Sequence, residues 1–447
     1  MSEHDILALF VILQLAAPLA ALLAIGGPTM LGRPVGEQTT TRLVGAGFAT
    51  GFLAAAAAIV VLAVRGFRPE IVHLATWFSV GHHESTIRLV ADALSVPYVL
   101  FSSGLCCLVN AFAGKYLHRE PGFARFFILL CLFGIGMNLM VLADSIDVLF
   151  AGWECLGISS ALLIGFFHER ANAVKAVLRA FTTYRICDVG ILVASVVIHR
   201  AVGSGDFDRL FGLNWPQGVC TVSDTTATIV SLLLVFAALG KSAQVPFSGW
   251  LPKAMEGPTP SSAIFYGALS VHAGAYVLLR CGPLLDQAPL ARITLIVIGI
   301  GTALHASLVG RVQTDLKSVL AFASMTQASL ILVEIGLGWR VIPLVHVVSH
   351  AILRSLQILR SPSALHDRHE LAAALGGHPG PGGWSLIDLL PKPWQDHLYR
   401  VALDRGYEEM AVGRFFVTPV LRFFDRMAAA EKTWLAWLGG DQPGGRR

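Results

Sequence analysis

The sequence predicts an all-α polytopic membrane protein. Of its 447 residues, 55% are hydrophobic and only 14% are charged, whereas a soluble globular protein carries about 25% charged residues. The apolar residues also gather in runs of about 20, the length that crosses a bilayer as a helix. The alternating pattern of a membrane barrel is absent from the sequence, so helices are expected to satisfy the backbone in lipid. A net charge of +4 spread through the loops gives no basis for binding nucleic acid.

The apolar runs predict about eleven transmembrane helices. We place them near residues 6–26, 43–64, 92–113, 123–143, 146–167, 181–202, 226–246, 260–280, 290–309, 318–338 and 340–360. The residues before the first run are acidic, and a secretory signal begins with a basic region, so we expect this run to be a retained span. The seven cysteines contain no CxxC pair, so their spacing predicts neither an iron–sulfur cluster nor a structural metal site.

Basic residues predict the orientation in the membrane. They gather in the loops after the third and fifth spans, at Lys115, Arg119, Arg125, Arg170, Lys175 and Arg179. The intervening loop, residues 143–147, has no basic residue. The positive-inside rule therefore places the N-terminus outside and, after eleven spans, the C-terminus in the cytoplasm.

The character of the chain changes after residue 360. We assign residues 1–360 to the transmembrane domain, 361–393 to a Gly- and Pro-containing linker, and 394–447 to an amphipathic tail. The tail mixes basic residues with aromatic residues such as Tyr399, Phe415 and Trp434. Two interpretations remain open for it: it lies on the membrane surface, or it docks a partner protein.

Charged residues inside the spans are the candidate functional groups, because each costs about 2.5–3.5 kcal/mol at the centre of a bilayer. Glu154 lies in the middle of the fifth span. Lys241 lies in the seventh, five residues before Pro246, which predicts a broken helix of the kind that builds ion sites in transporters. We expect Glu154 and Lys241 to lie close enough to interact, and a purely structural ion pair is the alternative. Arg185 and Asp188, three residues apart, are predicted to form a structural ion pair.

Histidines on the eleventh span suggest a proton path. His346 and His350 are four residues apart and share one face of a helix, as does Arg354. Histidine titrates near neutral pH, which favours a proton wire. A metal site is the alternative, but the sequence places no third ligand nearby, so we predict no metal. His272 and Lys317 also fall in or at the ends of spans.

These residues carry a family resemblance that covers about residues 90–360. The motifs are Gly152-Trp153-Glu154, Gly240-Lys241-Ser242-Ala243-Gln244-Val245-Pro246, residues 250–263, and Asp315-Leu316-Lys317 with residues 324–327. Together with His346 and His350, they resemble the proton-conducting subunits of respiratory complex I and of the Mrp antiporters. The resemblance implies that Glu154 and Lys241 form a proton-relay pair, with His272, Lys317, His346 and His350 as further proton-translocating groups.

At several positions this sequence differs from the usual family motifs, and these differences are similar to those of one branch of the family. Tyr266 stands where the eighth span usually has a histidine, His272 follows six residues later, and Arg354 replaces a lysine. The second inverted repeat is expected to be truncated after three helices. Residues 260–276 and the tail are similar to DabB, the membrane subunit of the DAB complexes that accumulate inorganic carbon. The resemblance implies a bacterial inner-membrane protein and a cytoplasmic, zinc-carrying partner similar to DabA, with no cofactor in this chain.

Three functions follow as hypotheses. The first is an energy-coupling subunit that conducts protons or Na⁺ down their gradient to drive CO₂ hydration to bicarbonate by the partner. The second is a proton-pumping subunit of a respiratory NADH–quinone oxidoreductase or a cation/proton antiporter. The third is a scaffold without transport activity. The chain itself is not expected to be an enzyme.

Overall fold

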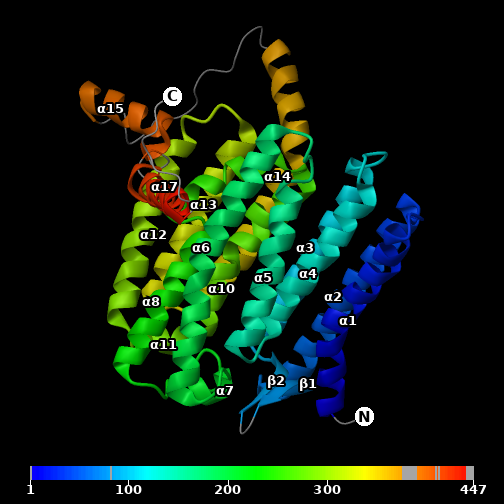
Figure 1. Cartoon of the computed structure of the whole chain (residues 1–447). Helices are drawn as coiled ribbons and strands as arrows, with labels where there is room; N and C mark the ends of the chain where they lie inside the picture. Colours follow the sequence, from blue (N-terminus) through cyan, green and yellow to red (C-terminus); the bar gives the residue numbers. More distant parts are fainter. Residues whose placement is uncertain (1–2, 81–82, 375–389, 408–409, 411–412, 439–447) are drawn as a thin grey trace. The chain divides into compact units, whose positions relative to one another are not determined.

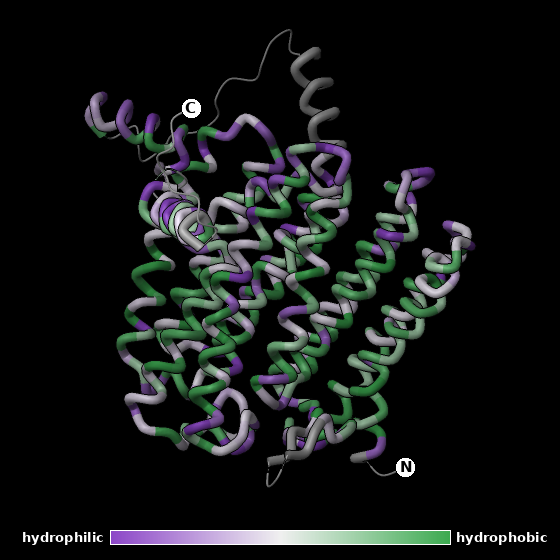
Figure 2. Tube along the Cα trace, in the orientation of Figure 1, coloured by the Kyte–Doolittle hydropathy of each residue, from purple (hydrophilic) through white to green (hydrophobic). Residues whose placement is uncertain are grey.

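The computed structural model describes residues 3–80, 83–374, 390–407, 410 and 413–438. In this part of the chain, eleven helices are long and apolar enough to cross a membrane. They are Asp5–Met30, Glu37–Val64, Ser95–Tyr116, Phe123–Leu142, Ile146–Ile164, Ala171–Val202, Asp224–Lys241, Thr259–Arg280, Pro289–Gly310, Leu316–Gly336 and Val341–Ser361. The prediction of an all-helical bundle with eleven spans is confirmed. In Figure 2 the helices are mostly hydrophobic along their length, and hydrophilic residues gather at many of their ends.

The helices of the bundle follow one another up and down, so most neighbours in sequence are neighbours in space (Figure 1). The first group comprises α1 (Glu3–Met30), α2 (Glu37–Val64), α3 (Ser95–Tyr116), α4 (Phe123–Leu142), α5 (Ile146–Ile164) and α6 (Ala171–Val202). The second comprises α8 (Asp224–Lys241), α12 (Pro289–Gly310), α13 (Leu316–Gly336) and α14 (Val341–Ala374). Helices α4 and α5 approach closely because Gly152 has no Cβ; a Cβ there would collide with the backbone of Met140. Small residues allow such close approach in membrane bundles.

Several of these helices have an N-terminal cap, in which a side chain accepts a hydrogen bond from the backbone of the first turn. The hydroxyl of Ser145 accepts a hydrogen bond from Val148 N at the start of α5, and Ser223 accepts one from Thr226 N at the start of α8. The Asp315 carboxylate does the same for Ser318 N at the start of α13. Each cap satisfies a backbone donor that the helix leaves free, which explains why the helices begin at these residues.

A two-stranded antiparallel hairpin joins α2 to α3, and the sequence did not predict it. Strand β1 (Glu70–Val80) pairs with β2 (His83–Ala91), with Glu70 opposite Ala91 and two irregularities in the register. Figure 1 places the hairpin at the end of the bundle where the N-terminus lies, together with the short helices α7 (Phe207–Leu210) and α11 (Gly282–Asp286). We refer to this end as the hairpin end.

The seventh and eighth spans carry the irregular backbone of the bundle. Helix α8 ends at Lys241 itself, and two 3₁₀ turns follow, Ser248–Trp250 and Lys253–Glu256. The eighth span is assembled from α9 (Thr259–Ser262), a π-helical segment (Ala263–Ala268), a 3₁₀ turn (Ser270–His272) and α10 (Ala273–Arg280). This span is fully buried in the bundle, and only protein-buried backbone tolerates such irregularity at membrane depth. A π-bulge often marks a functional site.

The C-terminal residues form a separate unit, 385–447. It contains α15 (Lys392–Leu403), a 3₁₀ turn (Arg405–Tyr407), a π-helical segment (Gly413–Val417) and α17 (Thr418–Leu438). Neither α15 nor α17 meets the criteria of a membrane span. Phe415, Phe424 and Trp434 are exposed at 68%, 62% and 59%. The linker expected at 361–393 begins as a continuation of α14, which is helical to Ala374, and residues 375–389 lie outside the described part of the chain.

Candidate functional site

A cluster of charges lies between α5 and α6. The Arg185 guanidinium forms an ion pair with Glu154, and its Nη2 lies 2.8 Å from Asp188 Oδ2. Trp153 Nε1 donates a hydrogen bond of 2.5 Å to Asp188 Oδ1. Asp188 is buried, whereas the Arg185 side chain remains 35% exposed. The cluster is therefore anchored in the bundle and reaches its lateral surface.

Lys241 lies in the adjoining interior and is fully buried. Its ammonium donates a hydrogen bond of 3.2 Å to Trp153 O and lies 4.9 Å and 4.5 Å from the ring centroids of Trp153 and Tyr184. Ring faces attract cations within about 6 Å. A Cβ on Gly157 would lie 2.5 Å from Lys241 Nζ. The missing side chain at Gly157 is therefore what leaves room for the ammonium.

Among the described residues, Glu154 is paired with Arg185 and makes no ion pair with Lys241. Glu154 and Lys241 belong to the same cluster through Trp153, which precedes Glu154 and accepts the lysine's hydrogen bond. The sequence predicts that Glu154 and Lys241 interact. In the structure the direct ion-pair partner of Glu154 is Arg185, and Lys241 lies nearby against Trp153. Arg185 also pairs with Asp188, as their spacing indicates.

Serine and histidine side chains form a second polar path, which leads from α5 into the eighth span. Ser160, one turn beyond Gly157 on α5, lies 3.4 Å from the Ser270 hydroxyl. Ser270 and His272 belong to the same 3₁₀ turn. His272 is fully buried, and its two ring nitrogens contact Ala268 O at 2.5 Å and His350 Nδ1 at 3.1 Å. The irregular backbone thus brings a histidine against the eleventh span.

His350 and His346 extend this path along α14. Their ring centroids lie 6.4 Å apart. His346 contacts Glu334 at 2.8 Å and Gln327 at 3.0 Å, both on α13. His350 Nε2 is buried and has no hydrogen-bond partner among the described residues. We define the polar column as Glu154, Arg185, Asp188, Lys241, Ser160, Ser270, His272, His350, His346 and Glu334.

Three other residues singled out in the sequence lie outside these contacts. Lys317 stands at the start of α13 and has no ion-pair partner in the described part of the chain. Arg354 donates a hydrogen bond of 2.8 Å to Gln357. Tyr266, in the place of the usual histidine, donates one of 3.2 Å to Ala254 O. The structure therefore connects the column through His272 rather than through the position of Tyr266.

Comparison with known proteins assigns the family. The model of the transmembrane part of the NADH:quinone oxidoreductase/Mrp antiporter family matches residues 143–375, which is more than half of the chain. This chain belongs to the antiporter-like membrane subunits of complex I and Mrp. The model of the complex I chain 5 N-terminus matches residues 77–127. The chain spans about half the length of the curated relatives it matches.

Individual relatives agree with this assignment. NADH-ubiquinone oxidoreductase chain 5 of Schizophyllum commune is 35% identical over 322 residues, covering 72% of this chain and 45% of the relative. NADH-quinone oxidoreductase subunit L of Mycobacterium tuberculosis is 34% identical over 297 residues, covering 66% and 46%. A structure of the Mrp complex from a Dietzia species has a TM-score of 0.65 at 23% identity, covering 90% of this chain and 43% of that chain. The archaeal membrane-bound sulfane sulfur reductase has a TM-score of 0.65 at 20% identity, covering 88% and 77%.

In this antiporter-like chain, buried polar groups that the sequence did not reveal continue from His272 toward the hairpin end. The Tyr98 hydroxyl donates to His272 O at 3.5 Å, and its ring lies 4.9 Å from that of Tyr276. Arg280 Nη2 donates to the Tyr276 hydroxyl at 2.9 Å, and the guanidinium pairs with Asp92. Burial alone would raise the pKa of the Asp92 carboxyl, but the Arg280 charge and hydrogen bonds hold it below its usual value.

A second charged cluster lies next to the hairpin. Arg88 Nη2 on β2 lies 2.7 Å from Asp144, 3.3 Å from Asp206 and 2.7 Å from Asp208. Asp144 is fully buried. Burial raises the pKa of its carboxyl to about 7; Arg88 opposes this shift, and Asp208 and Asp206 add to it. We refer to these four residues as the Arg88 cluster.

The described residues contain no group of three or more His, Cys, Asp or Glu side chains arranged to hold a metal ion. His346 and His350 contact Glu334, Gln327 and His272 instead.

Proposed function

We propose that this chain is a proton-conducting membrane subunit. The observation that carries the proposal is the polar column, which lines up exchangeable groups from α5, α6, α8, the eighth span, α13 and α14. Charges this deep in a membrane bundle are costly and mark ion or proton pathways. A static ion pair would account for Glu154 and Arg185, but it would not require the buried His272–His350 contact of 3.1 Å.

The contacts suggest how protonation at one end acts on the other. A proton on Glu154 removes its attraction for Arg185, which then has Asp188 as its only carboxylate partner in the cluster. With one negative charge fewer nearby, the positive charge on Lys241 is less favourable. The lysine then releases its proton toward Ser160 and Ser270, which lead to His272. Transfer of the Glu154 proton to the neutral Lys241 then restores the starting state, so that one proton has moved from Glu154 to His272.

The finer proposal is that this subunit couples a cation gradient to inorganic-carbon accumulation. Its support is the resemblance of residues 260–276 and of the tail to DabB. In this proposal protons, or Na⁺, move down their gradient to drive CO₂ hydration by a zinc-carrying, DabA-like partner. The chain lies in a bacterial inner membrane with its N-terminus outside, and the cytoplasmic tail helps to hold the partner. The exposed aromatic side chains Phe415 and Trp434 suit such an interface.

A second candidate function rests on the curated relatives. These are subunits of NADH–quinone oxidoreductases, and the fold is shared with an Mrp complex. In that case the same polar column would serve a respiratory complex or a cation/proton antiporter, with neighbouring membrane subunits as partners.

Growth in air separates the two candidates. The chain is expressed with and without a DabA-like, zinc-carrying protein, in a bacterium that needs added CO₂ because it lacks carbonic anhydrase. We expect growth in air only when both proteins are present, and loss of growth with Lys241→Met. Gly301→Ala is the matched control, because a Cβ there meets nothing within 4 Å. A gene neighbourhood of quinone and iron–sulfur subunits, with no growth in air, would favour the respiratory function instead.

A further inference from the structure

The Arg88 cluster has an excess of negative charge around one buried guanidinium. Asp144 precedes α5, Asp206 and Asp208 belong to the segment that contains α7, and Arg88 comes from β2. Another nearby cation, Arg209, is 62% exposed and lies 3.8 Å from Asp206. Three carboxylates facing one guanidinium repel one another, and a shared proton relieves that repulsion.

Asp144 is the member at which a proton would bind. The residue is fully buried, and its Oδ1 has no hydrogen-bond partner among the described residues. Its Oδ2 faces Arg88 Nη2 at 2.7 Å. A buried carboxylate oxygen without a donor is unfavourable when the group is charged, and protonation removes the charge. By contrast, Asp208 accepts two hydrogen bonds from Arg88 and is 30% exposed.

The other charges around Asp144 come from every neighbouring element. Arg280 on α10 pairs with Asp92, and the Arg280 charge also acts on Asp144. On the outer side, Asp147 of α5 lies 3.2 Å from His199 of α6. Arg280 has Asp92 as its ion-pair partner, so Arg88 is the guanidinium that faces the three carboxylates Asp144, Asp206 and Asp208.

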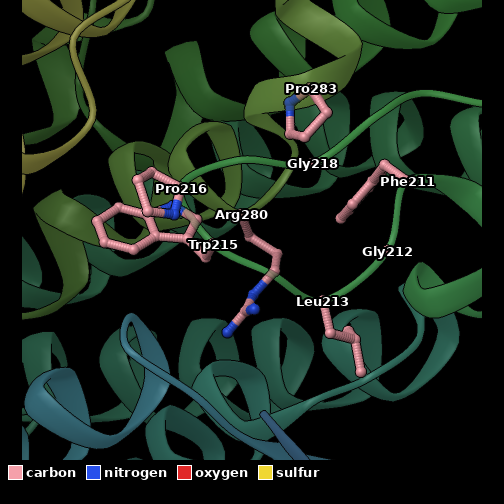
Figure 3. Close-up of a pocket in the computed structure, with 8 residues that line it drawn as sticks. All are labelled: Phe211, Gly212, Leu213, Trp215, Pro216, Gly218, Arg280 and Pro283. Atoms are coloured by element: carbon pink, nitrogen blue, oxygen red, sulfur yellow. The ribbon is translucent and has the colours of Figure 1, made fainter. Parts of the chain in front are cut away.

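Two buried tyrosine hydroxyls donate to backbone carbonyls, one of α4 and one of the eighth span. Tyr276 donates a hydrogen bond of 2.5 Å to Val141 O, in the last turn of α4 before Asp144. The same hydroxyl accepts from Arg280, and the adjacent Tyr98 reaches His272 O. Figure 3 shows Arg280 beside a small cavity of about 10 Å³, lined also by Trp215, Pro216 and Pro283. A cavity of this size has room for about one water molecule.

We propose that Asp144, held by Arg88 among Asp206 and Asp208, is a proton-binding site at which this chain exchanges protons with the solvent at the hairpin end. The inference rests on the proposed proton conduction and extends it: the hairpin end receives its own titratable group, distinct from Glu154 and Lys241. The ligand is the proton itself. The described residues offer no metal-binding group here.

The test uses the full chain in proteoliposomes with a pH-sensitive dye inside. Asp144→Asn and Asp208→Asn are compared with Asp224→Asn, an exposed acid at the same end of the bundle. We expect Asp144→Asn to lower proton flux by about tenfold or more, as loss of a positioned proton-transfer group does. Asp208→Asn should shift the pH dependence of flux to lower pH, because Asp144 then loses a neighbouring negative charge. Asp224→Asn should behave as wild type.

Infrared difference spectra between about pH 6 and about pH 8 supply a readout that does not depend on flux. Wild type should show the carbonyl stretch of a protonated carboxylic acid that titrates in this range, and Asp144→Asn should lack it. Persistence of that band in Asp144→Asn, or flux equal to that of Asp224→Asn, would overturn the site. If wild type conducts no protons but the band is lost in Asp144→Asn, the proton-binding site stands and proton conduction is what fails.

Discussion

Replacing Gly157 by alanine should disable the column without removing any charge. A Cβ at this position would lie 2.5 Å from Lys241 Nζ, about 1 Å inside the usual nonbonded separation. The ammonium must move away by that amount. Trp153 O lies one turn earlier on the same face of α5, so the hydrogen bond of 3.2 Å lengthens to about 4 Å and is lost. A hydrogen bond to a charged group contributes about 1.5–3 kcal/mol.

That energy sets the expected size of the effect. Since about 1.4 kcal/mol corresponds to a factor of ten, the population with Lys241 in its present position should fall about 10- to 100-fold. Proton flux through the reconstituted chain should fall in proportion. Thermal stability should fall by less than the lost hydrogen bond alone implies, because alanine is a better helix former than glycine by about 1 kcal/mol. Gly301→Ala is the control, since a Cβ there meets no atom within 4 Å. Equal flux in the two variants would refute the placement of Lys241 as the determinant of conduction.

Three further outcomes are expected. His350→Leu removes the 3.1 Å contact with His272 and should impair flux more than assembly; its disappearance from the membrane would instead make the histidine structural. Burial raises the pKa of Asp144 to about 7, so the folded chain binds more protons than the unfolded one between about pH 4 and about pH 7. Stability should therefore fall as pH rises through that window, and thermal unfolding of Asp144→Asn should lack this part of the fall. A chain ending after Ala374, at the end of α14, should stay in the membrane without co-purifying a zinc-carrying partner; undiminished co-purification would place docking on the loops.

The spans could be predicted from sequence because lipid imposes one requirement everywhere: about 20 apolar residues whose backbone bonds are satisfied within the helix. The hairpin has no such requirement. Residues 70–91 mix polar and apolar residues between two spans, and the pairing of the two strands has two register irregularities. The two strands, of 11 and 9 residues, are rich in Val, Ile and Thr, and that composition was the available signal.

Residues of the polar column could be predicted where a charge lies in an apolar run, which is energetically costly, or where two residues are close in sequence. A charge in an apolar run stands out, and spacing alone places Arg185 by Asp188 and His346 by His350. Contacts between distant segments left no such signal. Arg185 beside Glu154, His272 beside His350, and Asp92 beside Arg280 are each set by how the helices pack.

The Arg88 cluster could not be predicted from the sequence for the same reason. Its members come from a strand, a turn and a short helical segment, so no period in the sequence joins them. Asp144 and Asp206 are brought together by the bridge between Ser145 and Asp206 and by the hydrogen bond from Phe207 N to Asp144 O, of 2.9 Å. Only the folded chain places these carboxylates around one guanidinium.

Proton flux through the purified full chain, with and without Lys241→Met, tests the central claim most directly. The chain is reconstituted into vesicles that carry a pH-sensitive dye and are given a pH gradient and a counter-ion path. Wild type and Gly301→Ala should collapse the gradient, and Lys241→Met, folded and inserted to the same extent, should leave it near the rate of empty vesicles. Flux through Lys241→Met equal to that of wild type would contradict conduction along the polar column.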